Sequence, residues 1–447
     1  MSRPLITFCI ATYNRGPVVL DCLKHVLANG LPEAQFEIRI IDNASTDNTP
    51  DLITREFPNL HLTRLPKNCG PVAKNIAMRD AQGEFLVLLD DDAYPLPGAI
   101  PQMLHHFRED KYLAAAVFDV TLPDGSREGS AYPDVFIGAG TGLRRSALQK
   151  IATPADNHLV TLSPRHPVKS PPIATLPSHF FMQAEEYDLS FRLLNAGFSI
   201  QRFWDLPLTH LKAPNARIGQ RTTRLDVRNN LFLLAKYLPD PLCHQLAADW
   251  LARYFLMARQ RDLSQSPHPH FGTHKQAFIA GAAQGLAQWS THRANETHLL
   301  SPETVERIFK FRQIRERLER AVRRLGARRI IFAELGKNML AFHQAAREIG
   351  VDVLAIGDDQ LGKGGGGSGG GHEGDYRGTP LLCWEKMARW GGLKRADMVV
   401  ITNISPVHAP RRAEALRRVL PLPVVDLFSR QDRLLHGSPE PAAEAGL

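Results

Sequence analysis

Three adjacent carboxylates stand at the end of a strongly apolar segment, in the run EFLVLLDDDAYP of residues 84–95. The apolar residues predict a buried strand, and Asp90, Asp91 and Asp92 follow it directly. An exposed turn is one explanation, but turns usually contain Gly, Asn or Ser. Asp-x-Asp at a strand end offers the oxygen ligands that Mg²⁺ or Mn²⁺ prefers while it binds phosphate oxygens. The pattern therefore favours a metal–phosphate site.

Two further polar loops follow apolar segments. Asp42 ends the run FEIRIID and is followed by NASTDN, which also fits an Asx-rich turn that caps the next helix. A carboxylate at the strand end can accept hydrogen bonds from a base or a ribose. The first apolar run, LITFCI, leads into TYNR, where Tyr13 could stack on a base and Arg15 could face a phosphate.

The first hundred residues predict the elements that position these loops. Strands are expected over 5–10, 36–42, 60–65 and 84–90, with helices over 17–30, 50–57 and 71–83. This alternation is typical of βαβ units and a parallel sheet, whose ligands bind beyond the carboxyl ends of the strands. We expect Asp42 to lie beside the end of the fourth strand. Both polar loops would then hold one ligand.

A set of motifs in fixed order carries a family resemblance. The motifs are TYNR, IDNASTDNT, NCGPVAKN, LLDDDA, GAGTGLRR and EEYDLSFRLLNAGF. Because of these motifs, residues 4–239 resemble a family-2 glycosyltransferase of the GT-A fold. The later run RLDVRNNLFLLAKYLP is similar to the helix that follows the catalytic core in bacterial sugar transferases of rhamnosyl type.

The resemblance implies a role for each matching residue. It implies that Thr12, Tyr13 and Asp42 bind the nucleoside of the donor. Further donor contacts would come from Arg15, Lys74, Asp90, Asp91, Gly140 and Gly142, with the two glycines at the donor sugar. Asp92 and Asp90 would hold Mn²⁺ or Mg²⁺, with His210 as a late ligand or as a structural residue.

The catalytic base implied by the resemblance is a carboxylate at the start of a helix. The family pattern Glu-Asp reads Glu185-Glu186 here. Glu186 would take the proton from the acceptor hydroxyl, and Glu185 would contact the acceptor. Asp188 is the alternative base. The acids could instead have a purely structural role, because the helix dipole favours acidic residues in the first turn of a helix. This explanation fits Asp188 better than Glu186.

Composition bounds the class of protein. The chain has 447 residues, 43% of them hydrophobic, and its five cysteines include no Cys-x-x-Cys pair. A disulfide framework or structural zinc site is therefore not expected. No run of about 18 apolar residues predicts a transmembrane helix, and the N-terminus lacks the pattern of a signal peptide. We expect a cytoplasmic protein.

The net charge of +8 is concentrated in one segment, so nucleic acid is not an expected partner. Residues 306–329 contain ten Lys or Arg and three acids. Apolar residues recur at helical spacing within this segment. A helix at the inner face of an anionic membrane is one interpretation. A helix that packs its apolar face on protein is the other.

The predicted organisation is an α/β protein with several parts. A GT-A domain over 1–225 precedes a helical segment over 226–325. A small Rossmann-like domain over 326–430 contains the Gly-rich linker 362–372, and a disordered tail occupies 431–447. The dinucleotide fingerprint would fall on Ile331, Ala333 and Gly336, so two glycines are missing. Asp358 could hold a ribose, but a docking or regulatory module is favoured.

The function predicted is an inverting, metal-dependent transfer of a hexosyl or rhamnosyl group. The donor would be a nucleotide-sugar and the acceptor a hydroxyl of a saccharide or lipid-linked saccharide, in bacterial polysaccharide biosynthesis. Two alternatives remain. A nucleotidyltransferase would need a Gly-rich, Lys-bearing loop after the first strand, and ATYNRG is not one. A non-catalytic nucleotide-sugar sensor would bind the donor without transfer.

Overall fold

The computed structural model describes residues 3–154, 156, 171–212, 219–265, 273–293, 298–359 and 374–429. The chain forms two compact units. The first comprises Met1–Pro239 with Ala280–Thr304, and the second comprises Asp240–Ile279 with Val305–Leu447. The helical segment predicted over 226–325 is thus divided between them. The predicted linker 362–372 and tail 431–447 lie outside the described residues.

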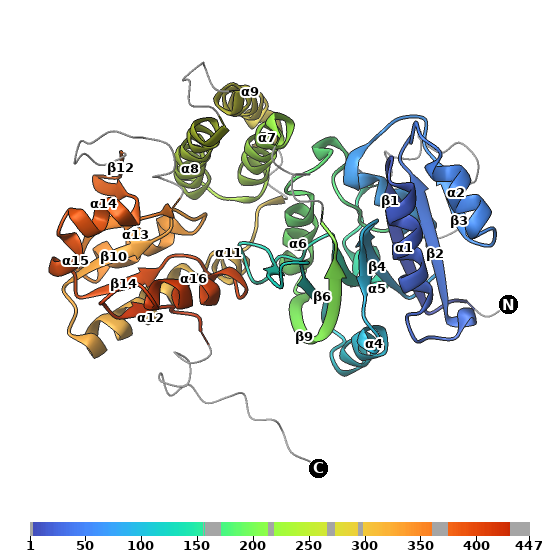
Figure 1. Ribbon diagram of the computed structural model, residues 1–447, viewed down its shortest axis with the longest axis horizontal. Coiled ribbons are helices and arrows are strands. Elements are labelled where there is room, and N and C mark those ends of the chain that lie inside the picture. Colours follow the sequence, from blue (N-terminus) through green and yellow to red (C-terminus); the bar gives the residue numbers. More distant parts are fainter. Residues whose placement is uncertain are drawn as a thin grey trace, which may run out of the picture. The chain divides into compact units, whose positions relative to one another are not determined.

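The first unit is built on a mixed sheet with strand order β3-β2-β1-β4-β8-β6-β9-β5, with β7 paired to β6 (Figure 1). Its strands are β1 Ile6–Thr12, β2 Phe36–Asp42, β3 His61–Arg64, β4 Phe85–Asp90, β5 Ala93–Pro95, β6 Leu113–Thr121, β7 Arg127–Glu128, β8 Gly140–Arg144 and β9 Ser199–His210. The first four strands are parallel, as predicted, and β8 runs antiparallel to β4.

In the described part of this unit, six helices lie between these strands along the chain, and two more follow β9. They are α1 Gly16–Leu27, α2 Thr49–Glu56, α3 Lys74–Asp80, α4 Ala99–Glu109, α5 Arg145–Lys150, α6 Glu185–Asn195, α7 Gln220–Tyr237 and α10 Trp289–Arg293. Residues 280–304 belong to this unit although they follow α8 and part of α9 in sequence. Leu300 N, for example, donates to Tyr237 O at the end of α7. The first unit is therefore discontinuous along the chain.

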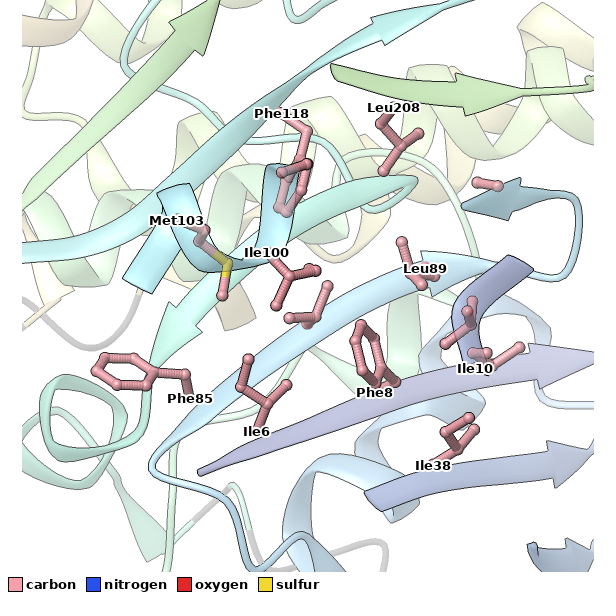
Figure 2. Close-up of a cluster of buried hydrophobic side chains, with 14 of the residues drawn as sticks. Ile6, Phe8, Ile10, Ile38, Phe85, Leu89, Ile100, Met103, Phe118 and Leu208 are labelled. Atoms are coloured by element: carbon pink, nitrogen blue, oxygen red, sulfur yellow. The ribbon is translucent and has the colours of Figure 1, made fainter. Parts of the chain in front are cut away.

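A large apolar cluster supports the strand ends (Figure 2). Ile6, Phe8 and Ile10 alternate along β1 and are completely buried. They lie among side chains from neighbouring strands and from α4, which include Leu89 and Met103. Burial of each large apolar side chain stabilises a fold by about 1.5–3 kcal/mol. The loops that carry the polar residues therefore emerge from a well-packed base.

Strand register brings those loops to one edge of the sheet. Thr12 at the end of β1 pairs with Asp42 at the end of β2, and Ala11 pairs with Asp90 at the end of β4. The expectation that Asp42 lies directly beside β4 is wrong, because β1 lies between β2 and β4. The three loops still converge, since parallel strands end at the same edge.

The second unit contains a smaller sheet with order β12-β13-β11-β10-β14-β15. Its strands are β10 Arg329–Ala333, β11 Asp352–Gly357, β12 Asp375–Tyr376, β13 Thr379–Leu382, β14 Met398–Ile401 and β15 Val424–Val425. All but β12 are parallel to their neighbours, in the order 3-2-1-4-5 of a doubly wound sheet. Ile331 and Ala333 lie within β10, so the predicted fingerprint does not form the turn, which begins at Glu334.

The helices of the second unit include the basic one. They are α8 Leu242–Gln265, α12 Phe311–Leu325, α13 Met339–Glu348, α14 Trp384–Arg389, α15 Gly392–Arg395 and α16 His408–Arg417, while α9 Thr273–Ala287 and α11 Pro302–Phe309 span the unit boundary. On α12, Ile314, Leu318 and Ala321 are completely buried, and this helix packs against α13. Ile314 and Leu318 of the apolar face expected at a membrane are thus covered by protein, whereas Leu325 at its end is 39% exposed. None of the described helices combines the length and apolar character that a membrane crossing requires.

Candidate active site

Two carboxylates and an imidazole converge at the carboxyl edge of the first sheet. Asp90 ends β4 and Asp92 follows it, and His210 ends β9, which pairs with β5 just beyond the carboxylates. His210 Nε2 lies 3.1 Å from Asp92 Oδ1 and 3.8 Å from Asp90 Oδ2. One ligand atom from each residue lies within 4.8 Å of the others, close enough to hold one metal ion. Carboxylates suit hard cations such as Mn²⁺ and imidazole suits transition metals, so this donor set can hold a divalent cation.

Two cations compensate the acidic charge of this loop. Arg15 donates to Asp91 Oδ1 at 2.9 Å and to Asp92 Oδ2 at 2.8 Å. The Lys74 ammonium is buried, 2.5 Å from Asp90 Oδ1. Both residues were expected to face the nucleotide, and the structure places both on the carboxylates that would bind its diphosphate through a metal.

The ring of His210 is held by acids from both sides. Its Nδ1 lies 2.7 Å from Glu128 Oε2, and Lys212 Nζ lies 2.7 Å from the other Glu128 oxygen. Burial alone would lower the pKa of His210, but hydrogen bonds with Asp92 and Glu128 raise it to about 9. Burial would raise the pKa of Asp92, but His210 and Arg15 hold it below its usual value. In the metal-free protein, a charged imidazole therefore balances Asp92.

Thr12 and Asp91 link β1 to the acidic loop. Thr12 Oγ1 donates to Asp91 Oδ2 at 2.8 Å. Burial raises the pKa of Asp91 to about 6, although Arg15 and Thr12 act in the opposite sense. The neighbouring Tyr13 is 41% exposed, so its ring is accessible to a ligand.

Asp42 is completely buried at the end of β2. Its Oδ1 accepts a hydrogen bond from Ser45 N at 3.3 Å. Its Oδ2 has no hydrogen-bond partner among the described residues, and Arg64 Nε lies 3.4 Å away as an ion pair. A buried carboxylate oxygen without a donor is unfavourable. An N–H or O–H group of a ligand would satisfy it.

A backbone bridge connects the candidate base to the acidic loop. Gly138 N donates to Glu186 Oε1 at 3.2 Å, and Lys74 Nζ donates to Gly138 O at 3.0 Å. Lys74 in turn pairs with Asp90. Glu186 is half-buried at the start of α6, beside the buried Glu185. The structure thus brings Glu186 into the same site as the predicted metal ligands.

Asp188, the alternative base, lies in a different environment. Its carboxylate accepts hydrogen bonds from Lys236 Nζ and Tyr237 Oη, each at 2.7 Å, and Arg192 lies 3.8 Å away. Burial would raise the pKa of Asp188, but Lys236, Arg192 and Tyr237 hold it below its usual value. The side chain is therefore a fixed anion within a buried ion network, which argues against Asp188 as the base and for the structural explanation.

Gly140 and Gly142 have a packing role that the resemblance did not imply. Both lie within β8 rather than in a turn. A Cβ atom on Gly142 would lie 2.3 Å from Met103 Sδ, and one on Gly140 would lie 2.8 Å from Leu208 Cδ1. These glycines face core side chains, so a lack of space in the core explains them without a contact to the donor sugar.

Three contributors to the site were not predicted from the sequence: Glu128, Lys212 and the backbone of Gly138. Glu128 lies in the two-residue strand β7, inside a run, DGSREGS, that has no strand pattern. The only feature of the sequence that points to Lys212 as part of the site is its position two residues after His210. Gly138 begins the motif GAGTGLRR, in which only the later glycines received a role.

Comparison with known proteins identifies the first part of the chain. Residues 7–155 match the family described as Glycosyl transferase family 2. This part of the chain is a family-2 glycosyltransferase domain. The match to the predicted family covers a third of the chain, and the predicted α/β class with further helical and sheet segments is confirmed.

Curated relatives share this glycosyltransferase domain. The chain is 32% identical over 89 residues to the poly(ribitol-phosphate) beta-N-acetylglucosaminyltransferase TarS of Staphylococcus aureus strain Mu50. This match covers 19% of this chain and 16% of TarS. The chain is also 30% identical over 135 residues to the chondroitin synthase of Pasteurella multocida strain Pm70. That match covers 29% of this chain and 14% of the synthase. The chain thus spans less than a fifth of the length of either relative.

Two solved structures resemble parts of the chain. Staphylococcus aureus TarS 1–349 in complex with UDP-GlcNAc has a TM-score of 0.45 and 16% identity, and the match covers 77% of this chain and 92% of that one. The mannosyltransferase PcManGT from Pyrobaculum calidifontis, in complex with GDP-Man and Mn²⁺, has a TM-score of 0.42 and 21% identity, and covers 64% of this chain and 88% of that one.

Proposed function

We propose that the chain is an inverting, metal-dependent transferase that moves a hexosyl or rhamnosyl group from a nucleotide-sugar to a hydroxyl of a saccharide acceptor. The observation that supports this most is the link from Glu186 through Gly138 and Lys74 to Asp90. A candidate base and a candidate metal site thereby share one site. The role in bacterial polysaccharide biosynthesis follows the relatives and is part of the proposal.

The nucleotide would bind across the carboxyl ends of β2, β1 and β4. The unsatisfied Oδ2 of Asp42 would accept a hydrogen bond from the base or ribose, and Tyr13 would stack on the base. Asp90, Asp92 and His210 would hold Mn²⁺ or Mg²⁺: the carboxylate oxygens suit both ions, and the imidazole nitrogen favours the transition metal Mn²⁺. The bound ion would stabilise charge on the departing diphosphate.

The chain's own residues would carry out the proton transfer. Glu186 would accept the proton of the acceptor hydroxyl as the oxygen forms a bond to the anomeric carbon. The bond from that carbon to the diphosphate would break, and the nucleoside diphosphate would leave. Glu185 would contact the acceptor. One displacement inverts the anomeric configuration.

Contact with an anionic membrane would be electrostatic if the acceptor is lipid-linked. Ile314 and Leu318 of α12 are buried, so insertion of this face into lipid would require unpacking the helix. Exposed arginines such as Arg323 would provide the charge, and their attraction would weaken with salt.

Incubation of the full chain with a panel of nucleotide-sugars, Mn²⁺ and saccharide acceptors tests the proposal. Release of nucleoside diphosphate with a glycosylated product of inverted anomeric configuration, determined by NMR, supports it. Release of pyrophosphate would indicate a nucleotidyltransferase. Binding without turnover across the whole panel would indicate a sensor.

A further inference from the structure

A backbone segment in unusual conformation leads directly into the candidate base. Phe181, Gln183 and Ala184 all have positive φ, of 66°, 71° and 67°, and none of them is glycine. Glu185 and Glu186 follow immediately as the first residues of α6. L-residues rarely adopt this conformation, and it persists only where the surrounding structure imposes it. One hydrogen bond inside the segment 179–184, from Met182 N to Phe180 O at 2.8 Å, supports this path, so contacts from outside the segment must supply the rest.

Two adjacent residues of α7 hold it through its carbonyl groups. Asn229 is completely buried, and its Nδ2 donates to Phe180 O at 3.1 Å and to Met182 O and Gln183 O at 2.8 Å each. An amide has two hydrogens, so one of them is shared between two carbonyls. Arg228 orients this amide, because its Nε donates to Asn229 Oδ1 at 2.8 Å.

Arg228 also binds the start of the segment. One of its terminal nitrogens donates to His179 O at 3.1 Å and to Phe180 O at 3.0 Å. The two side chains together contact the carbonyls of four of the five residues from 179 to 183. Side chains of α7 thus fix the path of the backbone that begins α6.

The remaining carbonyl, that of Phe181, faces Gly70. A Cβ atom on Gly70 would lie 2.4 Å from Phe181 O, and Gly70 itself has a φ of 74°. Gly70 O accepts a hydrogen bond from Asn43 Nδ2 at 3.0 Å, and Asn43 directly follows Asp42. The segment is therefore confined between α7 and the turn Gly70–Ala73, which is bonded to Asn43 beside the proposed nucleoside-binding carboxylate.

We propose that Asn229 is a positioning residue for the transfer reaction: it imposes the backbone path that places Glu185 and Glu186 in the active site. This inference rests on the proposed function, in which Glu186 is the base. Asn229 makes no contact with a reacting group. It acts by donating to the carbonyls of Met182 and Gln183, and it adds to the hydrogen bond that Phe180 O already accepts from Met182 N at 2.8 Å.

The neighbouring Asn230 provides a matched control. It is also buried on α7, but its Nδ2 donates to Asp226 O and Asp226 Oδ1, at 2.7 and 2.8 Å, within the same helix. Asn229→Ala and Asn230→Ala each remove one buried amide from α7. Only the first removes donors from the segment 179–184.

The test compares these variants in the full chain by transfer kinetics and by Mn²⁺-dependent binding of UDP and GDP. We expect Asn229→Ala to lower kcat by about 10–100-fold, since small misplacement of a catalytic group has effects of this size. Nucleoside diphosphate affinity should stay within about twofold, and the acidic limb of the pH–rate profile should shift with the displaced Glu186. Asn230→Ala should keep both kinetic constants. Asn229→Ser, which retains one donor, should lie between wild type and Asn229→Ala.

Three results would overturn the proposal. They are unchanged kcat in Asn229→Ala, equal losses in the two alanine variants, and a loss of nucleotide affinity in parallel with kcat. Hydrogen exchange of the amides of residues 180–186 tests the contact independently of activity and should be faster in Asn229→Ala or Asn229→Ser than in Asn230→Ala. A wild-type chain that transfers no sugar would refute the proposed function, whereas an active wild type with an unaffected Asn229→Ala would refute the positioning role alone.

Discussion

His210 Nε2 lies 3.1 Å from Asp92 Oδ1, while the other nitrogen of the same ring lies 2.7 Å from Glu128. The imidazole is therefore oriented toward the acidic loop by a second carboxylate, an arrangement common in metal-binding histidines. His210→Gln should weaken Mn²⁺ binding by at least about tenfold, on the scale known for perturbed metal sites. Isothermal titration with Mn²⁺ measures this.

His106 is the control for that prediction. It also pairs with a carboxylate, that of Asp205 at 2.9 Å, but on α4 and outside the site. His106→Gln should bind Mn²⁺ as wild type does. Equal affinity of His210→Gln and wild type would remove His210 from the metal site.

Asp188 should contribute to stability rather than to the chemical step. Asp188→Asn removes the anion of Lys236, whereas Arg192 keeps its ion pair with Asp156 at 2.6 Å, so the change should cost about 1.5–3 kcal/mol at pH 7. The pKa of Asp188 is lowered in the folded state, so its contribution is present above the unfolded pKa of about 3.9 and is lost as pH falls through the folded pKa. Urea unfolding at pH values from 7 down to 3 should show the two proteins converging at the acidic end. A stability difference that does not change with pH would contradict this account.

Gly142 should be required by the core. Gly142→Ala brings a methyl group to within 2.3 Å of Met103 Sδ and should destabilise the protein by about 1–3 kcal/mol, as overpacking does. Gly219→Ala is the control, because a Cβ there meets no atom within 4 Å. Chemical denaturation should separate the two variants. Full stability of a Gly142→Ala variant that loses donor affinity would restore the expected role at the donor sugar.

The discontinuity of the first unit predicts how the chain can be shortened. A chain ending at Pro239 lacks residues 280–304, which include the donor of the hydrogen bond from Leu300 N to Tyr237 O. A chain ending near Arg320 would stop inside α12. A chain ending at Thr304 keeps all of the first unit, so it should unfold at a higher temperature than one ending at Pro239. Differential scanning calorimetry tests this, and equal melting temperatures would argue against a structural role for 280–304.

The sequence predicted the site best where local pattern and chemistry coincide. Apolar strands that end on Asp42 and Asp90 could be recognised from the order of residues in each segment. The register of the strands then brings these two ends to one edge of the sheet. Strand order depends on non-local pairing, so the position of β1 between β2 and β4 was not predicted. Glu128 could not be found for the same reason, because β7 exists only through its pairing with β6.

Helical and glycine patterns were ambiguous in a similar way. The apolar spacing on α12 is the same for a helix on lipid and for one on protein, and only the buried Ile314 and Leu318 distinguish them. Glycines in GAGTGLRR fit a turn or a crowded strand equally well, and the neighbouring Met103 comes from a distant segment. The role of Asn229 could not be predicted from its position in a helical segment, because its partners are backbone carbonyls elsewhere in the chain.

The central claim is that Glu186 removes the acceptor proton in a metal-dependent sugar transfer. The most direct test is the transfer rate of Glu186→Gln, measured with Mn²⁺ and the nucleotide-sugar that supports wild-type turnover. We expect Glu186→Gln to bind the donor as wild type does and to lose about 10²–10⁴-fold in kcat, the usual contribution of a positioned base. Wild-type transfer should also stop in excess EDTA and return with added Mn²⁺ or Mg²⁺. Normal turnover by Glu186→Gln, or full wild-type activity in excess chelator, would contradict the account.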